Sequence, residues 1–187
     1  IDIGLSQAAI SATPVNFCLV EKRDVHHRLH HRKLFASKAD FGSAILYAGS
    51  YGMMGAAILA SRACMRAGVG KLTVSSPKCG HDIMQTAVPE AMFLHDRGNC
   101  NLAEIRPDRS YSAIAIGPGI GTNEMTVKAV EDYLASANTP VILDADALNC
   151  ISIKPAMLNS IPVLSIITPH AGEFDRLFGP QPSAEAL

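Results

Sequence analysis

Residues 113–121 read Ala-Ile-Ala-Ile-Gly-Pro-Gly-Ile-Gly, and this stretch decides the fold. The four apolar residues predict a short buried strand, and the glycines and proline directly after it predict a loop with unusual backbone angles. Such a loop can expose main-chain N–H groups to an anion. A sharp turn without a ligand has the same composition, so both interpretations stay open.

Similar apolar runs lie on both sides of this strand, with helical patterns between them. Strands that are apolar throughout and alternate with helices are typical of a parallel sheet covered on both faces. The sequence therefore predicts a doubly wound, mostly parallel α/β fold. The expected strands are residues 44–48, 71–75, 113–116, 141–143 and 163–167, and the expected helices are residues 53–67, 77–87, 123–136, 147–151 and 172–178.

The composition argues against several classes of protein. With 48% hydrophobic side chains among 187 residues, the chain can bury a sizeable core, which a disordered chain cannot. A formal net charge of -1 argues against general binding to nucleic acid or to anionic membranes. No apolar run reaches the roughly 18 residues of a membrane span. The five scattered cysteines include no CxxC pair, which argues against a disulfide framework or a zinc site and favours the reducing cytoplasm.

Residues 1–42 differ from the rest of the chain. We expect residues 1–3 to end a strand, residues 14–20 to be extended, and residues 21–42 to form an irregular polar linker or surface arm. The arm contains pairs of histidines with i,i+4 spacing, which would suit a metal ion on a helix. Because the arm is expected to be irregular, we interpret these histidines as solvated surface; they are His26, His27, His30 and His31.

The unusual residues of the sequence follow the expected strands. The strand ends lead into Ser50, into the loop over residues 117–121, into Asp144 and Asp146, and into His170. In sheets of this kind, ligands bind outside the carboxyl ends of the strands. The sequence therefore predicts one crevice that is lined by bare backbone, two carboxylates and an imidazole.

The loop over residues 49–55 fits a loose GxxGxxG pattern between a strand and a helix. Its glycines could let a phosphate or sugar approach a helix N-terminus, or could serve a tight turn and close helix packing. A dinucleotide-binding dehydrogenase would need an acidic residue after the second strand. That position reads Ser75-Ser76-Pro77, which argues against a dehydrogenase.

Alternatives also stay open for the acidic and imidazole groups. Asp144 and Asp146 could position a substrate hydroxyl or a magnesium-bound phosphate, but aspartate is also favoured as a helix N-cap. We interpret His170 as a ligand contact. The alternative is a helix start in which Thr168 is the cap and Glu173 is an acid of the first turn.

Seven motifs follow one another along residues 38–179. The motifs are KADFG (38–42), GSYGMMGAA (49–57), RAGVG (66–70), VPEAM (88–92), GPGIG (117–121), LDADALN (143–149) and TPHAGEF (168–174). In order and spacing they resemble the ADP/ATP-dependent NAD(P)H-hydrate dehydratases, a ribokinase-like family that also forms the C-terminal domain of bifunctional NAD(P)H-hydrate repair enzymes. The resemblance makes residues 1–20 the tail of a preceding epimerase-like domain, residues 21–42 a linker, and residues 43–187 the N-terminal part of the dehydratase domain.

The resemblance implies a repair reaction. In this family ADP or ATP phosphorylates the hydroxyl that hydration adds to NADH or NADPH, and loss of phosphate restores the dihydronicotinamide; Mg²⁺ is a candidate companion of the nucleotide. The resemblance also implies which residues act. The hydrated cofactor would be held by Met53, Met54, Gly55, Ala56, Gly119, Gly121 and His170, and the polar wall would be shaped by Asp144, Asn149 and Glu173.

The same resemblance implies that part of the site lies elsewhere. The family's Gly-Thr-Gly-Asp motif, with the catalytic aspartate, and its nucleotide-binding segments come beyond the position of Leu187. Since the chain also begins with Ile1, we expect a piece of a longer protein with a fused epimerase domain, inactive by itself.

Two other functions stay open. One is a small-molecule kinase of the same fold that acts on a vitamin or sugar, and the other is a non-catalytic module that binds nicotinamide cofactors. In either case the helix over residues 53–67 is apolar almost all round. It is therefore expected to be buried or to form a subunit contact, which favours a homo-oligomer.

Overall fold

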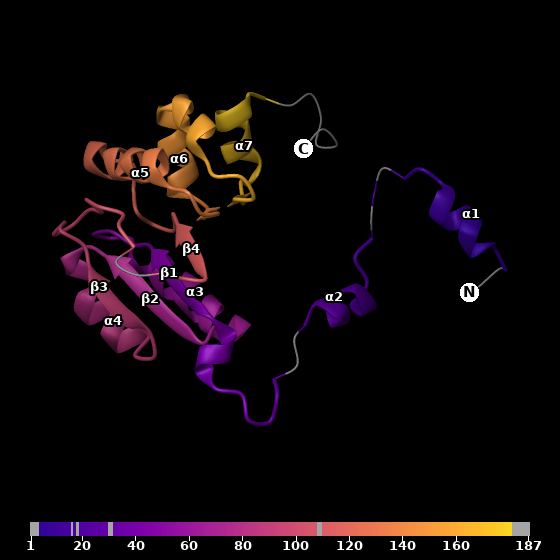
Figure 1. Ribbon diagram of the computed structural model, residues 1–187. Coiled ribbons are helices and arrows are strands. Elements are labelled where there is room, and N and C mark those ends of the chain that lie inside the picture. Colours follow the sequence, from indigo (N-terminus) through magenta and orange to yellow (C-terminus); the bar gives the residue numbers. More distant parts are fainter. Residues whose placement is uncertain (1–3, 16, 18, 30–31, 108–109, 181–187) are drawn as a thin grey trace. The chain divides into compact units, whose positions relative to one another are not determined.

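A computed structural model describes residues 4–15, 17, 19–29, 32–107 and 110–180. The chain divides into two compact units, Ile1–Ala36 and Ser37–Leu187, and each is described by itself (Figure 1). The strand end predicted over residues 1–3 lies outside the described residues.

The first unit holds two short helices, α1 (Gln7–Ala12) and α2 (Lys22–Arg28). The prediction of an irregular arm was therefore wrong where α2 lies. The helix can start there because the Asp24 carboxylate accepts the backbone N–H of Glu21 at 2.9 Å, in the manner of a capping box. The described part of residues 14–20 is neither helix nor strand.

The second unit is built on a six-stranded sheet in the order β3-β2-β1-β4-β5-β6. Every pairing between neighbouring strands is parallel, which confirms the predicted sheet. The strands are β1 (Ser43–Tyr47), β2 (Lys71–Ser76), β3 (Met92–His95), β4 (Ala113–Ile116), β5 (Ile142–Leu143) and β6 (Ile166–Ile167).

Strand β1 shows why helices cover both faces of the sheet. Ile45 and Tyr47 belong to one buried apolar cluster, and Leu46 and Ala48 belong to another, because successive side chains of a strand point to opposite faces. The first cluster includes side chains of α5 (Glu124–Ser136), α6 (Asp146–Ile153) and α7 (Ala171–Phe178). The second includes those of α3 (Met54–Ala67) and α4 (His81–Ala87), on the other side of the sheet (Figure 1).

Short 3₁₀ turns complete the second unit, at Lys38–Phe41, Lys78–Gly80 and Pro155–Ser160. No helix within the described ranges combines the length and the apolar character needed to cross a bilayer.

Two strands differ from the prediction by more than one residue. Strand β3 was not predicted, because it is a four-residue edge strand with partly exposed side chains and lacks a long apolar run. Strand β6 is shorter than the predicted residues 163–167. Leu164 is 82% exposed and has a φ of 68°, a left-handed conformation that interrupts an extended strand.

Helix α3 buries one face only. Met54, Ala57 and Ser61 are buried, whereas Leu59 is 70% exposed on the same helix. The helix is therefore not buried all round, although its sequence is mostly apolar.

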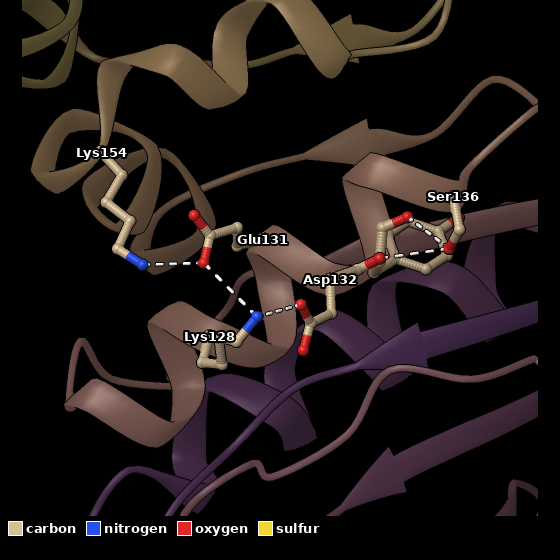
Figure 2. Close-up of polar contacts among 6 residues, drawn as sticks. Lys128, Glu131, Asp132, Ser136 and Lys154 are labelled. Carbon is tan, nitrogen blue, oxygen red and sulfur yellow. Dashed lines mark hydrogen bonds and ion pairs between the residues drawn. The ribbon is translucent and has the colours of Figure 1, made fainter.

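Ion pairs join α5 to the end of α6 (Figure 2). Nζ of Lys154 lies 2.7 Å from Glu131, which also lies 3.8 Å from Nζ of Lys128, and Lys128 pairs with Asp132. Ser136 Oγ donates to the backbone oxygen of Asp132 at 3.1 Å and so closes the last turn of α5. Exposed ion pairs contribute only about 0.2–1 kcal/mol each. The buried cluster beneath α5 therefore matters more to its position than these pairs do.

Candidate functional site

The strand order reverses between β1 and β4, and we call the edge formed by the loops after their carboxyl ends the crevice. Chain connections leave β1 toward β2 and leave β4 toward β5, so the loops after these neighbouring strands diverge to opposite sides of the sheet. This reversal is the topological switch point, where α/β sheets bind ligands. The predicted site residues follow β1, β4, β5 and β6, whose loops meet at this edge.

Main-chain and hydroxyl contacts fasten the first two loops together. The Gly49 N–H donates to the carbonyl of Pro118 at 2.8 Å, and Ser50 Oγ donates to the carbonyl of Gly119 at 2.8 Å. Ser50 is 1% exposed, so this hydroxyl bond is shielded from water. The floor of the crevice is therefore a rigid seam between the loops after β1 and β4.

The glycines of the loop after β4 are required by close packing. A Cβ on Gly117 would lie 1.7 Å from the carbonyl oxygen of Asp144, and one on Gly119 would lie 2.7 Å from that of Met53. Gly119 also has a φ of 69°, which side chains disfavour. Close packing is therefore enough to explain why these two positions are glycine, which is what the alternative of a sharp turn without a ligand proposed.

The four predicted residues after β1, at positions 53–56, form the start of α3 and divide into three exposed or partly exposed residues and one buried residue. Met53 is 41% exposed and caps α3, and Ala56 packs against Gly119 on the crevice side. Gly55 is exposed, with open space where a side chain would be. Met54, in contrast, is 5% exposed and its sulfur accepts a 3.5 Å bond from Ser76 Oγ, so it belongs to the core.

A chain of hydrogen bonds links the loop after β4 to α6 and α7. The Gly121 N–H donates to Oδ2 of Asp146 at 2.9 Å, and Nδ2 of Asn149 donates to Oδ1 of the same carboxylate at 3.2 Å. Nη2 of Arg176 then donates to Oδ1 of Asn149 at 2.9 Å. Both ends of the Asn149 amide are thus held, which fixes its orientation.

The neighbouring thiol of Cys150 lies in the same region. Its Sγ is 3.6 Å from the carbonyl of Gly121, and the side chain is fully buried. Burial, together with the nearby charge of Asp146, raises the pKa of Cys150 to about 12. The thiol is therefore protonated at neutral pH and is not a nucleophile of this site.

Asp144 and Asp146 face different partners because of the residue between them. Ala145 has a φ of 49°, a left-handed conformation that is costly for alanine, and this residue caps α6 without a side-chain bond. Asp144 accepts a 2.8 Å bond from Oγ1 of Thr168, after β6. Neither aspartate is the N-cap, so the capping alternative was wrong for this helix.

His170 and Glu173 form the start of α7. Glu173 accepts the His170 N–H at 3.0 Å, and Nδ1 of His170 accepts the Gly172 N–H at 3.1 Å. The cap is therefore His170 and not Thr168, whereas Glu173 is a first-turn acid as the alternative proposed. The His170 side chain is 68% exposed and that of Glu173 only 7%.

Sequence reasoning gave Ser50 and Arg176 no role in the site, and it offered Asp146 as a helix cap or a substrate or phosphate contact, not as the anchor of the loop after β4. Ser50 and Asp146 lie inside the motifs that were quoted, but their bonds to backbone groups of another loop leave no trace in the sequence. Arg176 resembles any basic residue in the last turn of a helix. Its bond to Asn149 spans 27 positions and depends on how α6 packs on α7.

A separate cavity of about 410 Å³ lies near the amino ends of β4 and β5, away from the crevice. Its polar lining includes Arg97, Glu104, Arg106 and Tyr133. Arg97 and Arg106 form ion pairs with Glu104 at 3.0 Å and 2.9 Å, and both arginine side chains are exposed. None of the predicted site residues lines this cavity.

Among the described residues, no group of three or more His, Cys, Asp or Glu side chains is arranged to hold a metal. His26 and His27 lie on α2 and are exposed, while His30 and His31 lie outside the described residues.

Comparisons with known proteins find a matching family and several relatives. The model of the NAD(P)H-hydrate dehydratase family matches residues 44–185. The ADP-dependent (S)-NAD(P)H-hydrate dehydratase of Bacillus subtilis is 39% identical over 155 residues, which are 83% of this chain and 54% of that protein. A bifunctional NAD(P)H-hydrate repair enzyme of Moorella thermoacetica is 29% identical over 186 residues, or 95% of this chain and 35% of that protein. The chain thus spans about half the length of the first relative.

Solved structures agree with the sequence matches. The ADP/ATP-dependent NAD(P)H-hydrate dehydratase of Bacillus subtilis, co-crystallised with ATP and Mg²⁺, superposes with a TM-score of 0.67 at 34% identity, over 84% of this chain and 55% of that one. A ribokinase-like superfamily protein of Enterococcus faecalis gives a TM-score of 0.63 at 25% identity, over 79% of this chain and 51% of that one. The doubly wound sheet is therefore of the ribokinase-like type.

Proposed function

Because the chain belongs to the NAD(P)H-hydrate dehydratase family, we propose that it takes part in the nucleotide-dependent repair of hydrated NADH or NADPH. The hydroxyl oxygen on the hydrated ring takes a phosphoryl group from ADP or ATP. The bond from carbon to this oxygen then breaks as a neighbouring ring proton leaves, and the dihydronicotinamide is restored with release of phosphate. The family match over residues 44–185 carries this proposal.

We assign the substrate side of the reaction to the crevice. The exposed imidazole of His170 and the fixed amide of Asn149 offer polar contacts, and Asp144 offers a carboxylate. A fixed amide can distinguish a hydroxyl from a hydrogen atom on the ring, since a ligand without the hydroxyl leaves it unpaired. The small, apolar remainder of the surface is provided by Met53, Gly55, Ala56, Gly119 and Gly121.

Two of the predicted contacts act from behind this surface. Met54 lies in the core beneath the loop after β1, and the Glu173 carboxylate is buried and bonded to the backbone of His170. We propose that both position their neighbours and do not touch the substrate.

ADP or ATP is the proposed phosphoryl donor. The names of relatives that depend on ADP, and a relative crystallised with ATP and Mg²⁺, support a nucleotide as co-substrate. No residue of the chain is assigned to the nucleotide or to Mg²⁺, and the expected catalytic aspartate beyond Leu187 stays a prediction.

The same relatives support a proposed domain arrangement. The alignment with the bifunctional enzyme of Moorella thermoacetica extends to 95% of the chain, against 83% for the single-function relative. We propose that residues 1–20 continue a fused epimerase domain and that residues 21–42 link it to residues 43–187. We further propose a cytoplasmic location, which suits the free cysteines of the described residues.

Self-association is proposed through α3, on which the apolar side chain of Leu59 is 70% exposed. Sedimentation of the chain tests this. A Leu59→Glu variant is expected to shift a dimer to monomer, and a wild-type monomer at high concentration would contradict the proposal.

Binding and turnover test the proposed function separately. Calorimetry is expected to show that the chain binds hydrated NADH more tightly than NADH, and that His170→Ala weakens this about tenfold, as losing one polar contact does. His27→Ala, in the first unit, is the control and should bind normally. Equal affinity for both dinucleotides would contradict the assignment of the crevice.

Turnover is measured with ADP or ATP present, for the chain and for a form extended past Leu187. Return of the dihydronicotinamide absorbance supports repair. Stable transfer of phosphate to a vitamin or sugar, without repair, would instead identify a kinase.

A further inference from the structure

Two cysteines outside the crevice network lie in neighbouring loops of the second unit. Cys79 is in the 3₁₀ turn after β2, and Cys100 is in the loop after β3. The Cys79 N–H donates to the carbonyl of Asn99 at 2.9 Å, and Sγ of Cys79 lies 4.0 Å from the carbonyl oxygen of Cys100.

These contacts make the two cysteines neighbours. The Cys79 N–H donates to the residue directly before Cys100, and the Cys79 sulfur itself lies against the Cys100 backbone. A disulfide needs its two cysteines to come this close. The Lys78 N–H makes the preceding bond of the same series, to Gly98 at 3.0 Å, so the pairing is not a single accidental contact.

The loop that carries Cys100 is held in place from within. The Asp96 carboxylate accepts the backbone N–H groups of Arg97, Gly98 and Ala103 at 2.6, 3.2 and 2.5 Å, and Asp96 is 8% exposed. Because the loop is anchored around this buried carboxylate, the two thiols stay near each other.

The loop also supports the crevice. The carbonyl of Cys100 accepts the N–H of Tyr51 at 2.8 Å. Tyr51 follows Ser50, whose hydroxyl fastens the seam to Gly119. A displacement of the Cys100 backbone would therefore act directly on the turn of the crevice floor, through this one hydrogen bond.

We propose that Cys79 and Cys100 form a reversible disulfide that tightens the turn at Tyr51. The exposed Cys100 thiolate attacks a low-molecular-weight disulfide and releases one small thiol. The Cys79 thiolate then attacks the Cys100 sulfur of the mixed disulfide and releases the second. Both cysteines are oxidised, and the small disulfide is reduced to two thiols, so a small thiol in excess reverses the step.

The other described cysteines are not placed for this reaction. Cys150 is fully buried, and Cys64 lies on α3, packed against the apolar cluster beneath it. Burial raises the pKa of Cys79, and the nearby Cys100 raises it further, so closure of the bond is expected to quicken as pH rises. The inference does not depend on the reaction of the crevice.

The test treats the chain with oxidised glutathione and maps the products by non-reducing digestion and mass spectrometry. The expected product is a peptide pair joined through Cys79 and Cys100, lighter by two hydrogens than the reduced pair and released by dithiothreitol. Cys64→Ser should still form it, whereas Cys79→Ser should stop at a glutathione adduct on Cys100. A lasting glutathione adduct on Cys100 in the wild-type chain, or a bond to another cysteine, would overturn the proposal.

Amide hydrogen exchange tests the link to the crevice without any variant. Exchange at the Tyr51 amide is expected to slow several-fold on oxidation and to recover on reduction, because the disulfide restrains its acceptor. Unchanged exchange at Tyr51 in the cross-linked chain would overturn the coupling to the turn.

Discussion

Arg176 donates a 2.9 Å hydrogen bond to Oδ1 of Asn149, and this contact between α7 and α6 holds the oxygen end of an amide whose nitrogen end is held by Asp146. Without it, only the Nδ2 bond to Asp146 would hold the Asn149 side chain, and the amide oxygen would lose its fixed position. The proposed substrate contact of Asn149 thus depends on a side chain that does not face the substrate.

Replacing Arg176 is therefore expected to weaken binding without unfolding the chain. Arg176→Ala removes a charge-assisted bond, which is worth about 1.5 kcal/mol or roughly a tenfold rise in the dissociation constant for hydrated NADH. Calorimetry measures the constant. Arg66→Ala, an exposed arginine in the last turn of α3, is the matched control. A normal constant for Arg176→Ala would show that the orientation of Asn149 does not matter.

Gly117 is expected to tolerate no side chain. In Gly117→Ala the new Cβ would lie 1.7 Å from the carbonyl oxygen of Asp144, so the backbone of one loop must move. We expect a loss of about 3 kcal/mol or more in the free energy of unfolding, measured by urea denaturation.

Gly52→Ala is the control for this substitution. Gly52 also has a positive φ, of 83°, but nothing lies within 4 Å of the added Cβ. Only conformational strain of about 1–2 kcal/mol is then expected. Equal losses for the two variants would mean that the contact with Asp144 is not the cause.

The folded chain is expected to become more stable when Ala145 is replaced by glycine. The φ of 49° at this position costs alanine about 1–3 kcal/mol, and part of this is regained in Ala145→Gly after the extra chain entropy of glycine. The expected result is a rise of about 1 kcal/mol in the free energy of unfolding. If the variant is destabilised instead, this backbone conformation is not strained.

The raised pKa of Cys150 predicts a loss of stability at alkaline pH. Since the pKa is near 12 in the folded chain and 9.0 without burial, the contribution is complete below pH 9 and is lost as pH rises toward 12. The largest slope is about 1.4 kcal/mol per pH unit. The free energy of unfolding should therefore fall more steeply with rising pH for the wild-type chain than for Cys150→Ala. Parallel curves for the two proteins would show that the pKa of Cys150 is not raised.

Apolar patterning predicted the centre of the fold well. Strand β4 has the predicted residues, and α5 begins one residue after the predicted start because Asn123 is its cap, accepting the Thr126 N–H at 3.1 Å. Edges were harder to predict. Strand β3 and the end of β6 depend on pairing with one neighbour, and α2 depends on a local bond of Asp24.

The candidate site was predictable in place but not in its connections. The family resemblance implied Gly119, Gly121 and Asn149, and in the structure Asp146 joins Asn149 of α6 to the loop that holds the two glycines. The bonds from Ser50 to Gly119 and from Arg176 to Asn149 were not predictable, because they join segments whose approach depends on tertiary packing. The roles of the site residues stay proposals.

The seam between Ser50 and Gly119 means that much of the crevice floor is main chain. A surface of this kind has no side chains to exchange, so a single substitution there changes its shape only by displacing a whole loop. Differences in ligand preference would therefore arise at the rim, at positions such as Met53 and His170. A substitution in the floor would either leave the loop where it is or displace the whole loop and disrupt the crevice.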